Sequence, residues 1–397
     1  MNTVSIQYAG PALLGFPALG QGLWVDRLND GAEALEIIDW LQSAHLELLV
    51  DLRNDGAFDR LEQALRVCAS SETDIWLLVV VDDAQPHAQL RQLAGLINER
   101  FVIRGVLVTP AAYLESYQPD GIWPCGMTPV EVAQLAREYV PQVMIGAGVP
   151  TFFTELNRCR PTPGSFDYLT HATSPIVHAA DDASIVESLQ ALPDVFRSGR
   201  ALADGKPYRL TTSAVGAWRN PYGGQLTPNP QRERLTLSDQ DPRQRGLLAA
   251  VWTLAHYHAA QCSGVDAIAL WAVNEPFSVA SAQHYWPVFH VIKGLSLARG
   301  RSALVFETSS PDIVALGWSE DGGENVRLWL GNLSCELQTL EIIGAEVTGC
   351  TVLDQDSYVT ALSDPQFMQP ARESPVPTLK AWAVAVIDCR LTVEPAL

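Results

Sequence analysis

Eight short, almost uninterrupted apolar runs recur along the chain, and each is followed by a stretch whose apolar residues have helical spacing. Runs of this kind are typical of strands in a parallel sheet, because helices cover both faces of such a sheet. The runs occupy residues 14–25, 46–53, 75–83, 103–114, 142–158, 166–179, 208–218 and 266–279. Eight strand–helix units over roughly 290 residues fit a closed (β/α)8 barrel better than an open doubly wound sheet. The sequence therefore predicts an α/β fold of the TIM-barrel type.

The pattern changes after about residue 300, where short alternating runs are separated by Gly, Asp, Asn and Ser. Such alternation is typical of antiparallel strands, and the segment EDGGEN between two of the runs indicates a hairpin turn. We therefore expect two domains, a barrel over residues 1–300 and a small antiparallel β-sandwich over residues 301–397. Barrels followed by β-sandwiches are common among carbohydrate-active enzymes, which is an argument from fold alone.

The composition limits the expected partners. The net charge of -19 repels a phosphate backbone, so neither nucleic acid nor an anionic membrane is expected as a partner. No nucleotide-binding GxGxxG or GxxxxGK[ST] motif follows a predicted strand, and we expect no cofactor. The partner that remains is a small substrate, and the composition does not decide the oligomeric state.

The cysteines and the apolar runs indicate the cellular compartment in which the protein is expected. Seven cysteines are scattered without a CxxC pair, which predicts reduced thiols and no zinc or other metal site. The first residues lack the basic and apolar regions of a secretory signal, and the longest apolar runs have only the length of a strand. We therefore expect a cytoplasmic protein.

Position in the barrel selects the candidate site residues, because active sites of TIM barrels lie at the carboxyl ends of the strands. The polar and aromatic residues at or just beyond the predicted ends are Asp51, Arg53, Glu155, Asn157, Arg158, His171, His178, Asp181, Asn220, Tyr222, Trp271, Asn274 and Glu275. We expect the members of this set other than the candidate acids and bases to bind substrate.

Glu155 and Glu275 are the most informative pair in this set. Two carboxyl groups at strand ends can divide acid and base roles when their surroundings separate their pKa values. The sequence Asn-Glu-Pro at 274–276 resembles the Asn-Glu of many barrel glycosidases, although theirs lies at the fourth strand and this one at the eighth. The alternative for each glutamate is a structural role, such as capping a loop or pairing with an arginine.

His171 and His178 allow three interpretations. A metal site needs both rings to converge with a carboxylate, yet seven residues of extended chain span over about 20 Å. Ser174 and Pro175 could bend the chain back, and Asp181 or its neighbour is well placed to cap the next helix. We expect a corner that contacts a ligand rather than a metal, with a purely structural corner as the alternative.

Residues 218–246 form a long loop rich in Pro, Gly, Asn and Arg. Loops of this length inside a barrel are usually lids or binding loops. Asn220, Tyr222 and Asn229 are expected to hydrogen-bond the hydroxyl groups of a ligand, whereas Asp241 and Arg243 are expected to begin the following helix.

Three segments carry a resemblance to a known family: FTELNRCRPTPGSFDYLTHATSPIVHAADDASIVESLQALP, YRLTTSAVGAWRNPYGG and, further on, TPNP with DPRQRGLLAAVWTLAH. They resemble the barrel region of D-apionate lactonases, bacterial enzymes of apiose catabolism that open D-apionolactone to D-apionate. The resemblance extends over about residues 15–300, and members of the family are longer, with additional sequence before the barrel. It implies site positions without individual roles at Glu155, Asn157, Arg158, His171, His178, Asp181 and Asn220.

The resemblance predicts a hydrolase that acts on a small sugar-derived lactone. Opening a lactone needs a base to activate water, donors for the oxyanion and an acid for the leaving oxygen. We expect Glu155 to be the base, and Arg158, Asn157 or a histidine to stabilise the oxyanion. His178, held by one of the two aspartates that follow it, is expected to protonate the leaving oxygen.

Two other functions remain open from the sequence. The first is a glycoside hydrolase that uses Glu155 and Glu275 as its carboxyl pair. The second is a non-catalytic sugar-binding barrel, in which Trp24, Trp218 and Trp271 would serve as aromatic platforms.

Overall fold

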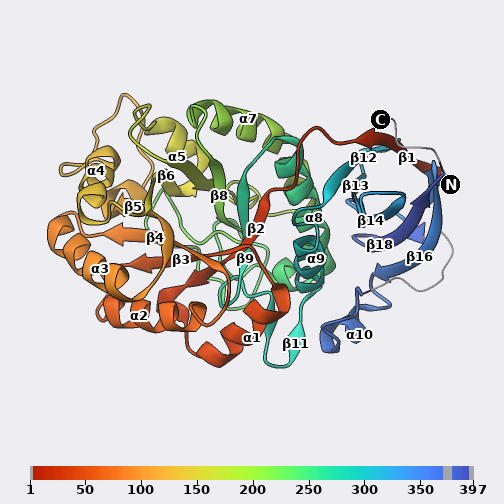
Figure 1. Ribbon diagram of the computed structural model, residues 1–397, viewed down its shortest axis with the longest axis horizontal. Coiled ribbons are helices and arrows are strands. Elements are labelled where there is room, and N and C mark those ends of the chain that lie inside the picture. Colours follow the sequence, from red (N-terminus) through yellow and green to blue (C-terminus); the bar gives the residue numbers. More distant parts are fainter. Residues whose placement is uncertain (1–2, 370–377, 393–397) are drawn as a thin grey trace.

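The computed structural model describes residues 3–369 and 378–392, and it contains a closed barrel beside a second sheet (Figure 1). The barrel strands are β2 (Ala18–Trp24), β3 (His45–Asp51), β4 (Asp74–Val81), β5 (Ile103–Pro110), β6 (Met144–Phe152), β7 (Tyr168–Ala172), β8 (Tyr208–Ser213) and β9 (Ala267–Ala272). Each strand pairs in parallel with the next, and β9 pairs with β2 to close the circle. The predicted TIM barrel is confirmed.

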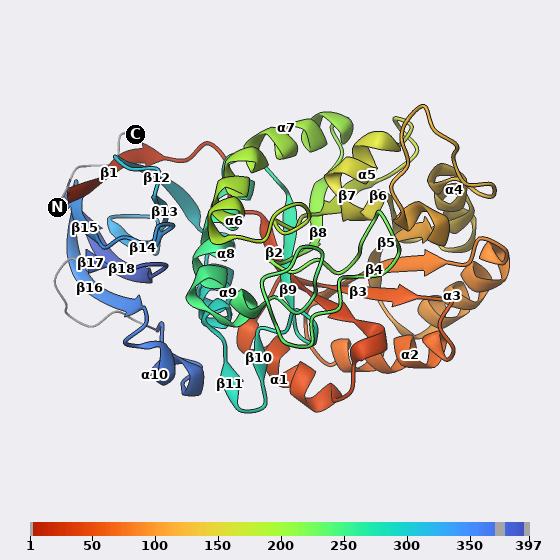
Figure 2. The ribbon, with the colours of Figure 1, turned by 180° about the vertical axis from the view of Figure 1, so that it is seen from behind.

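Helices cover the outside of the barrel, as both views show (Figure 2). They are α1 (Gly31–Leu41), α2 (Ala57–Cys68), α3 (Pro86–Arg100), α4 (Pro129–Tyr139), α5 (Phe153–Arg158), α6 (Asp182–Ser188), α7 (Leu192–Leu202), α8 (Leu247–Cys262) and α9 (Pro287–Ser296). Local chemistry sets where several of them begin: Asp30 accepts the free N–H groups at the start of α1, and Thr128 with Glu131 forms a capping box on α4. None of the helices in the described residues is long and apolar enough to span a bilayer.

Large aromatic side chains fill the barrel interior because glycines on adjacent strands make room for them. A Cβ atom at Gly105 would lie 2.5 Å from the Trp76 ring, and one at Gly146 would lie 2.5 Å from the Tyr168 ring. The two rings meet edge to face, with centroids 5.0 Å apart. The interior is therefore a packed core rather than a channel.

A charged pair crosses this interior. Arg209 on β8 lies 3.4 Å from Glu47 on β3, and its guanidinium carbon lies 3.6 Å from the centroid of the Trp76 ring. Both charged side chains are buried. Burial raises the pKa of Glu47, and the positive charge of Arg209 partly opposes that rise.

The second sheet contains eight strands in the order β16-β18-β14-β13-β12-β1-β15-β17. Their bounds are β1 (Thr3–Pro11), β12 (Ser302–Thr308), β13 (Ile313–Ser319), β14 (Asn325–Asn332), β15 (Gln338–Ile343), β16 (Ala345–Leu353), β17 (Thr378–Leu379) and β18 (Val384–Leu391). All pairs are antiparallel except β1 with β15, and the predicted hairpin between β13 and β14 is confirmed. One face of the sheet covers a core of its own. The other face packs against α8 and the barrel (Figures 1 and 2).

The first strand departs from the expected domain division. β1 pairs with β12 and β15 in the second sheet, so residues 3–11 are not part of the barrel, contrary to the expectation for residues 1–300. The reason is local: Val4 and Ile6 are buried while Thr3 and Gln7 are exposed, the alternation of a sheet with one solvated face. The other boundary, near residue 300, stays our proposal, with α9 ending at Ser296 and β12 beginning at Ser302.

Candidate active site

A cavity of about 450 Å³ lies at the carboxyl ends of β6 and β7. Its wall includes residues 152–155 at the end of β6 and residues 172–175 and 177–179 after β7. The helical side is formed by residues of α6, α7 and α8 and by Ala191 between the first two. The cavity therefore occupies the region in which TIM barrels carry their active sites.

Glu155 is the buried acid of this cavity. It lies in the first turn of α5 and is 4% exposed, because β6 leads directly into this short helix. The hydroxyl of Ser116 donates to its Oε1 at 2.8 Å, and Arg158 donates to the same hydroxyl from Nη1. Its Oε2 is buried and has no hydrogen-bond partner among the described residues.

The pKa of Glu155 is raised above its ordinary value. The main cause is burial, which penalises the ionised carboxylate. The hydrogen bond from Ser116 and the positive charge of Arg158 act in the opposite direction and are outweighed. A carboxyl group with a raised pKa on a cavity wall is a candidate for acid–base chemistry.

His178 and Tyr222 line the same cavity as Glu155, so the structure brings together three of the predicted site residues. The rings of His178 and Tyr222 lie 6.1 Å apart, and Tyr222 is 54% exposed. His178 comes from the turn after β7, and Tyr222 comes from the long loop after β8. These two side chains form the solvent-exposed side of the cavity.

The predicted support of His178 by an aspartate is wrong. Asp181 caps α6, where its carboxylate accepts the N–H and the hydroxyl of Ser184 at 2.9 and 2.6 Å. Asp182 forms ion pairs with Arg234 and Arg243. Both carboxylates are therefore engaged at the start of the helix, and Asp181 does not reach the cavity wall.

His171 also lies apart from the cavity, contrary to the prediction of ligand contact. Strand alternation directs its ring toward the helix layer, where Nε2 meets the Tyr208 hydroxyl at 2.7 Å and Nδ1 meets the Ala172 carbonyl at 2.9 Å. Burial lowers the pKa of His171 to about 4. Both ring nitrogens are thus occupied inside the protein.

The residues at the end of β9 have structural roles rather than the predicted contacts to substrate. Trp271 is fully buried, and its Nε1 donates to Thr253 on α8 at 2.7 Å. Trp24 is also buried, and Trp218 meets its ring edge-on while donating to the carbonyl of Pro150. The buried Trp24 and Trp271 are thus not available as the aromatic platforms expected of a sugar-binding barrel, whereas Trp218 is partly exposed.

Asn274 ties the end of β9 to the end of β2. Its Oδ1 accepts the backbone N–H of Trp24 at 3.0 Å, and its Nδ2 donates to the Trp24 carbonyl at 2.8 Å. We expect Asn274→Ala to lower the free energy of unfolding by about 1–3 kcal/mol, because it leaves two part-buried backbone groups without partners. Urea unfolding measures this loss.

The matched control for that measurement is Asn220→Ala. The Asn220 side chain accepts the backbone N–H of Tyr222, in a local loop turn. Its removal is expected to change the free energy of unfolding by about 0.5 kcal/mol or less. Equal losses in the two variants would contradict the bridging role of Asn274.

Glu275 is separate from Glu155. It is exposed, it pairs with Arg245 at 3.1 Å, and it lines a different cavity of about 130 Å³ beside η4 (Pro242–Arg245). The two glutamates predicted as a glycosidase pair thus lie on the walls of different cavities.

The remaining predicted residues contact near neighbours in the chain. Arg53 and Asp51 pair at 2.6 Å after β3, and Asn157 accepts hydrogen bonds from Arg160 on the surface. None of these side chains lines the cavity of Glu155. The prediction assumed that polar residues at the carboxyl ends of barrel strands contact substrate. It did not consider that such residues can pair with one another instead.

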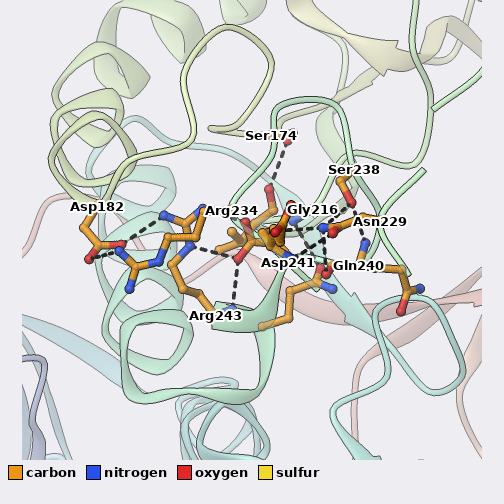
Figure 3. Close-up of polar contacts among 12 residues, drawn as sticks. Ser174, Asp182, Gly216, Asn229, Arg234, Ser238, Gln240, Asp241 and Arg243 are labelled. Atoms are coloured by element: carbon orange, nitrogen blue, oxygen red, sulfur yellow. Dashed lines mark hydrogen bonds and ion pairs between the residues drawn. The ribbon is translucent and has the colours of Figure 1, made fainter. Parts of the chain in front are cut away.

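A charge cluster, buried at Asp241 and Arg243 and more exposed at Asp182 and Arg234, holds the long loop after β8 (Figure 3). Arg243 donates to Asp241 from Nε at 2.8 Å and to Asp182 from Nη1 at 2.9 Å, while Arg234 reaches the second oxygen of Asp182. Asp241 and Arg243 begin η4, close to where the sequence predicted a helix start. The cluster links this loop to the N-terminus of α6, beside the cavity.

Asn229 closes the same loop on itself rather than contacting a ligand. Its Nδ2 donates to the carbonyl groups of Glu233 and Gln240 and to the hydroxyl of Ser238 (Figure 3). Asn229 is buried, so the prediction that it hydrogen-bonds ligand hydroxyls is wrong.

Two residues of the site escaped prediction from the sequence. Ser116 lies on an irregular segment after β5 and reaches Glu155 only in the folded chain. Trp252 lies within the apolar α8, and its ring forms part of the cavity wall. Neither has a local signal in the sequence, because a serine in a loop and a tryptophan in an apolar helix are both common. Within residues 3–369 and 378–392, no three His, Cys, Asp or Glu side chains are grouped so as to hold a metal ion.

Comparisons with known proteins agree with the fold and the family resemblance. Residues 19–300 match the model of the D-apionate lactonase TIM barrel domain, and residues 311–387 match that of the D-apionate lactonase C-terminal immunoglobulin-like domain. A D-apionate lactonase from Brucella anthropi is 35% identical over 245 residues. That alignment covers 60% of this chain but only 39% of the relative's length.

Glycoside hydrolases are among the solved structures with the same architecture. A family 51 α-L-arabinofuranosidase from Bifidobacterium longum has a TM-score of 0.63 at 13% identity, and the match covers 98% of this chain and all of that one. A GH30 endoxylanase from Clostridium papyrosolvens has a TM-score of 0.58 at 9% identity, with the same coverage. Identities this low establish a shared fold only. Since the barrel model matches most of the chain, the protein belongs to the D-apionate lactonase family.

Proposed function

We propose that this chain is a hydrolase that opens a sugar-derived lactone of the D-apionolactone type, with Glu155 as the general base. The observation that carries the proposal is the state of Glu155, which is buried on a cavity wall at the carboxyl end of the barrel. Ser116 anchors one of its oxygens, and the other has no partner in the part of the chain that the structure describes. The relative from Brucella anthropi, named a D-apionate lactonase, supports the substrate class.

The chemistry requires one proton acceptor and one proton donor. The carboxylate of Glu155 takes a proton from water, and the water oxygen bonds to the lactone carbonyl carbon. When the tetrahedral intermediate collapses, the ring C–O bond breaks and the leaving oxygen takes a proton from His178. The products are a hydroxy carboxylate and one net proton, which makes turnover measurable as acid release.

Ser116 and Arg158 position the base in this proposal. The Ser116 hydroxyl holds Oε1 of Glu155, and Arg158 in turn donates to Ser116. These two hydrogen bonds hold Oε1, so Oε2 is the oxygen that accepts the proton. Arg158 also places positive charge beside the carboxylate. Asn157, in contrast, is bound to Arg160 on the surface, so it is a poor candidate for stabilising the oxyanion.

The positions of the glutamates favour a lactonase over a glycosidase. Glycosidases place their two carboxyl groups about 5–5.5 Å apart when retaining and about 6.5–9.5 Å apart when inverting, on either side of one bond. Glu275 lines a separate cavity and pairs with Arg245. It therefore does not share a substrate site with Glu155.

We expect D-apionolactone to be hydrolysed above its spontaneous rate, as measured by acid release in a pH-stat, while aryl glycosides are not cleaved. The activity is expected to fall as the pH drops through a midpoint above the ordinary glutamate value of about 4.3, because the base must be ionised and burial raises its pKa. Glycoside cleavage without lactone opening would contradict the proposal. A loss of lactone turnover in EDTA would point to a metal ion and away from a base acting alone.

A further inference from the structure

The cavity that contains Glu155 is larger than a single sugar lactone requires. Its volume of about 450 Å³ is within the range of pockets for drug-sized ligands, roughly 300–1,000 Å³. Leu192 and Val195 from α7 form part of its wall, and Val177 and Phe153 add further apolar surface. A lactone ring at Glu155 would leave this apolar wall in contact with water.

The hydroxyl groups on the wall offer little to a polar ligand, because four of them are already hydrogen-bonded within the protein. The pairs are Thr173 with His256, Ser174 with the Val215 carbonyl, Ser184 with Asp181, and Ser188 with the Ile185 carbonyl. These four hydroxyls are therefore less available to hydrogen-bond a ligand. Desolvating a ligand's hydroxyls without replacing their hydrogen bonds is unfavourable.

Two buried polar atoms of the lining residues, Oε2 of Glu155 and Nε1 of Trp252, have no hydrogen-bond partner among the described residues. The Trp252 ring is fixed against His256, with centroids 4.8 Å apart, so its N–H has a set direction. With the polar groups of Glu155, His178 and Tyr222, this apolar wall matches a ligand with a polar head and an apolar remainder.

We propose that the cavity takes a lactone whose ring carries an apolar arm, alkyl or aryl, with the ring at Glu155 and the arm against Val177, Leu192 and Val195. This inference rests on the proposed lactonase function and narrows its substrate class. The reaction is unchanged: water adds to the carbonyl carbon, the ring C–O bond breaks, and the arm stays on the product.

A series of γ-lactones with growing alkyl chains, from γ-butyrolactone to γ-decalactone, tests the proposal on the full chain. We expect kcat/KM to rise about fourfold for each added methylene until the cavity is full, since each buried methylene contributes about 0.8 kcal/mol. Val195→Phe, which occupies the space of the arm, is expected to lower kcat/KM for γ-decalactone at least tenfold and to leave γ-butyrolactone within twofold. Leu202→Phe on the same helix, outside the cavity, is the matched control and is expected to change neither.

Binding of γ-decalactone, measured by calorimetry, separates the failure of this inference from failure of the lactonase proposal. If lactones are opened but chain length has no effect, or D-apionolactone is preferred to every alkyl lactone, the apolar-arm inference is overturned while the lactonase proposal stands. If no lactone is opened but γ-decalactone binds and Val195→Phe abolishes that binding, the lactonase proposal fails and the apolar site is supported. Absence of both turnover and binding overturns both.

Discussion

Glu155→Gln is expected to lower kcat for lactone opening by about 10²–10⁴-fold, the usual contribution of a general base. Glutamine retains the shape of the side chain and can still accept the hydrogen bond from Ser116, but it cannot take a proton from water. The loss should therefore appear in kcat, with KM changed little. Initial rates of acid release over a range of D-apionolactone concentrations measure the two constants separately.

Glu275→Gln is the matched control, because it makes the same change in a glutamate of the other cavity. Activity within about twofold of wild type is expected, since surface changes away from a site have small effects. Equal losses in the two variants would instead support a carboxyl pair, and full activity of Glu155→Gln would remove Glu155 from the mechanism.

The same replacement is expected to make the protein more stable at neutral pH. Burial raises the pKa of Glu155 in the folded chain, so folding favours the protonated form and the carboxylate is destabilising once it ionises. The stability that this group contributes is fully present below the unfolded pKa, about 4.3, and is lost as pH rises through the higher folded value. Glutamine is neutral at every pH. We thus expect Glu155→Gln to melt about 2 °C above wild type at pH 8 and to lose this advantage near pH 4.

Arg209→Met is expected to lower the free energy of unfolding by about 3–5 kcal/mol, the usual cost of removing one partner of a buried ion pair. Methionine fills much of the volume of arginine, so the loss reports mainly on charge. Without Arg209, the buried carboxylate of Glu47 loses its guanidinium partner, and the Trp76 ring loses its cation–π partner. Denaturant unfolding at pH 7 measures the change.

The double variant Glu47→Gln with Arg209→Met is the control for charge. Because it removes the uncompensated carboxylate, it should recover most of the stability that Arg209→Met loses. A loss below about 1 kcal/mol in Arg209→Met, or no recovery in the double variant, would show that the pair contributes little.

The barrel and the hairpin of the second sheet were predictable because their signals are local. Eight apolar runs with helices between them leave few other ways to bury so much apolar surface, and EDGGEN supplies the turn residues that a hairpin needs. The strand at residues 3–11 was assigned to the wrong domain. Its alternation of apolar and polar residues predicts a strand with one solvated face, but the partners of that strand, β12 and β15, lie about 300 residues away.

The site was predictable in part, and for a physical reason. Parallel strands of a barrel end on the same face, so the sequence alone placed Glu155, His178 and Tyr222 in one region. The sequence could not decide which strand-end residues form hydrogen bonds to other protein groups instead of lining the cavity, as His171 and Asn274 do.

The sequence by itself thus determined the strands, the helices and the face of the barrel on which the chemistry is expected. Only the tertiary structure decided that Ser116 anchors Glu155, that Glu275 belongs to another cavity and that Trp252 completes the wall. Strands and helices follow from periodicities of two and 3.6 residues, which any short window contains. Side-chain contacts between distant segments depend on how whole helices and strands pack. That packing cannot be inferred from the sequence of a short window.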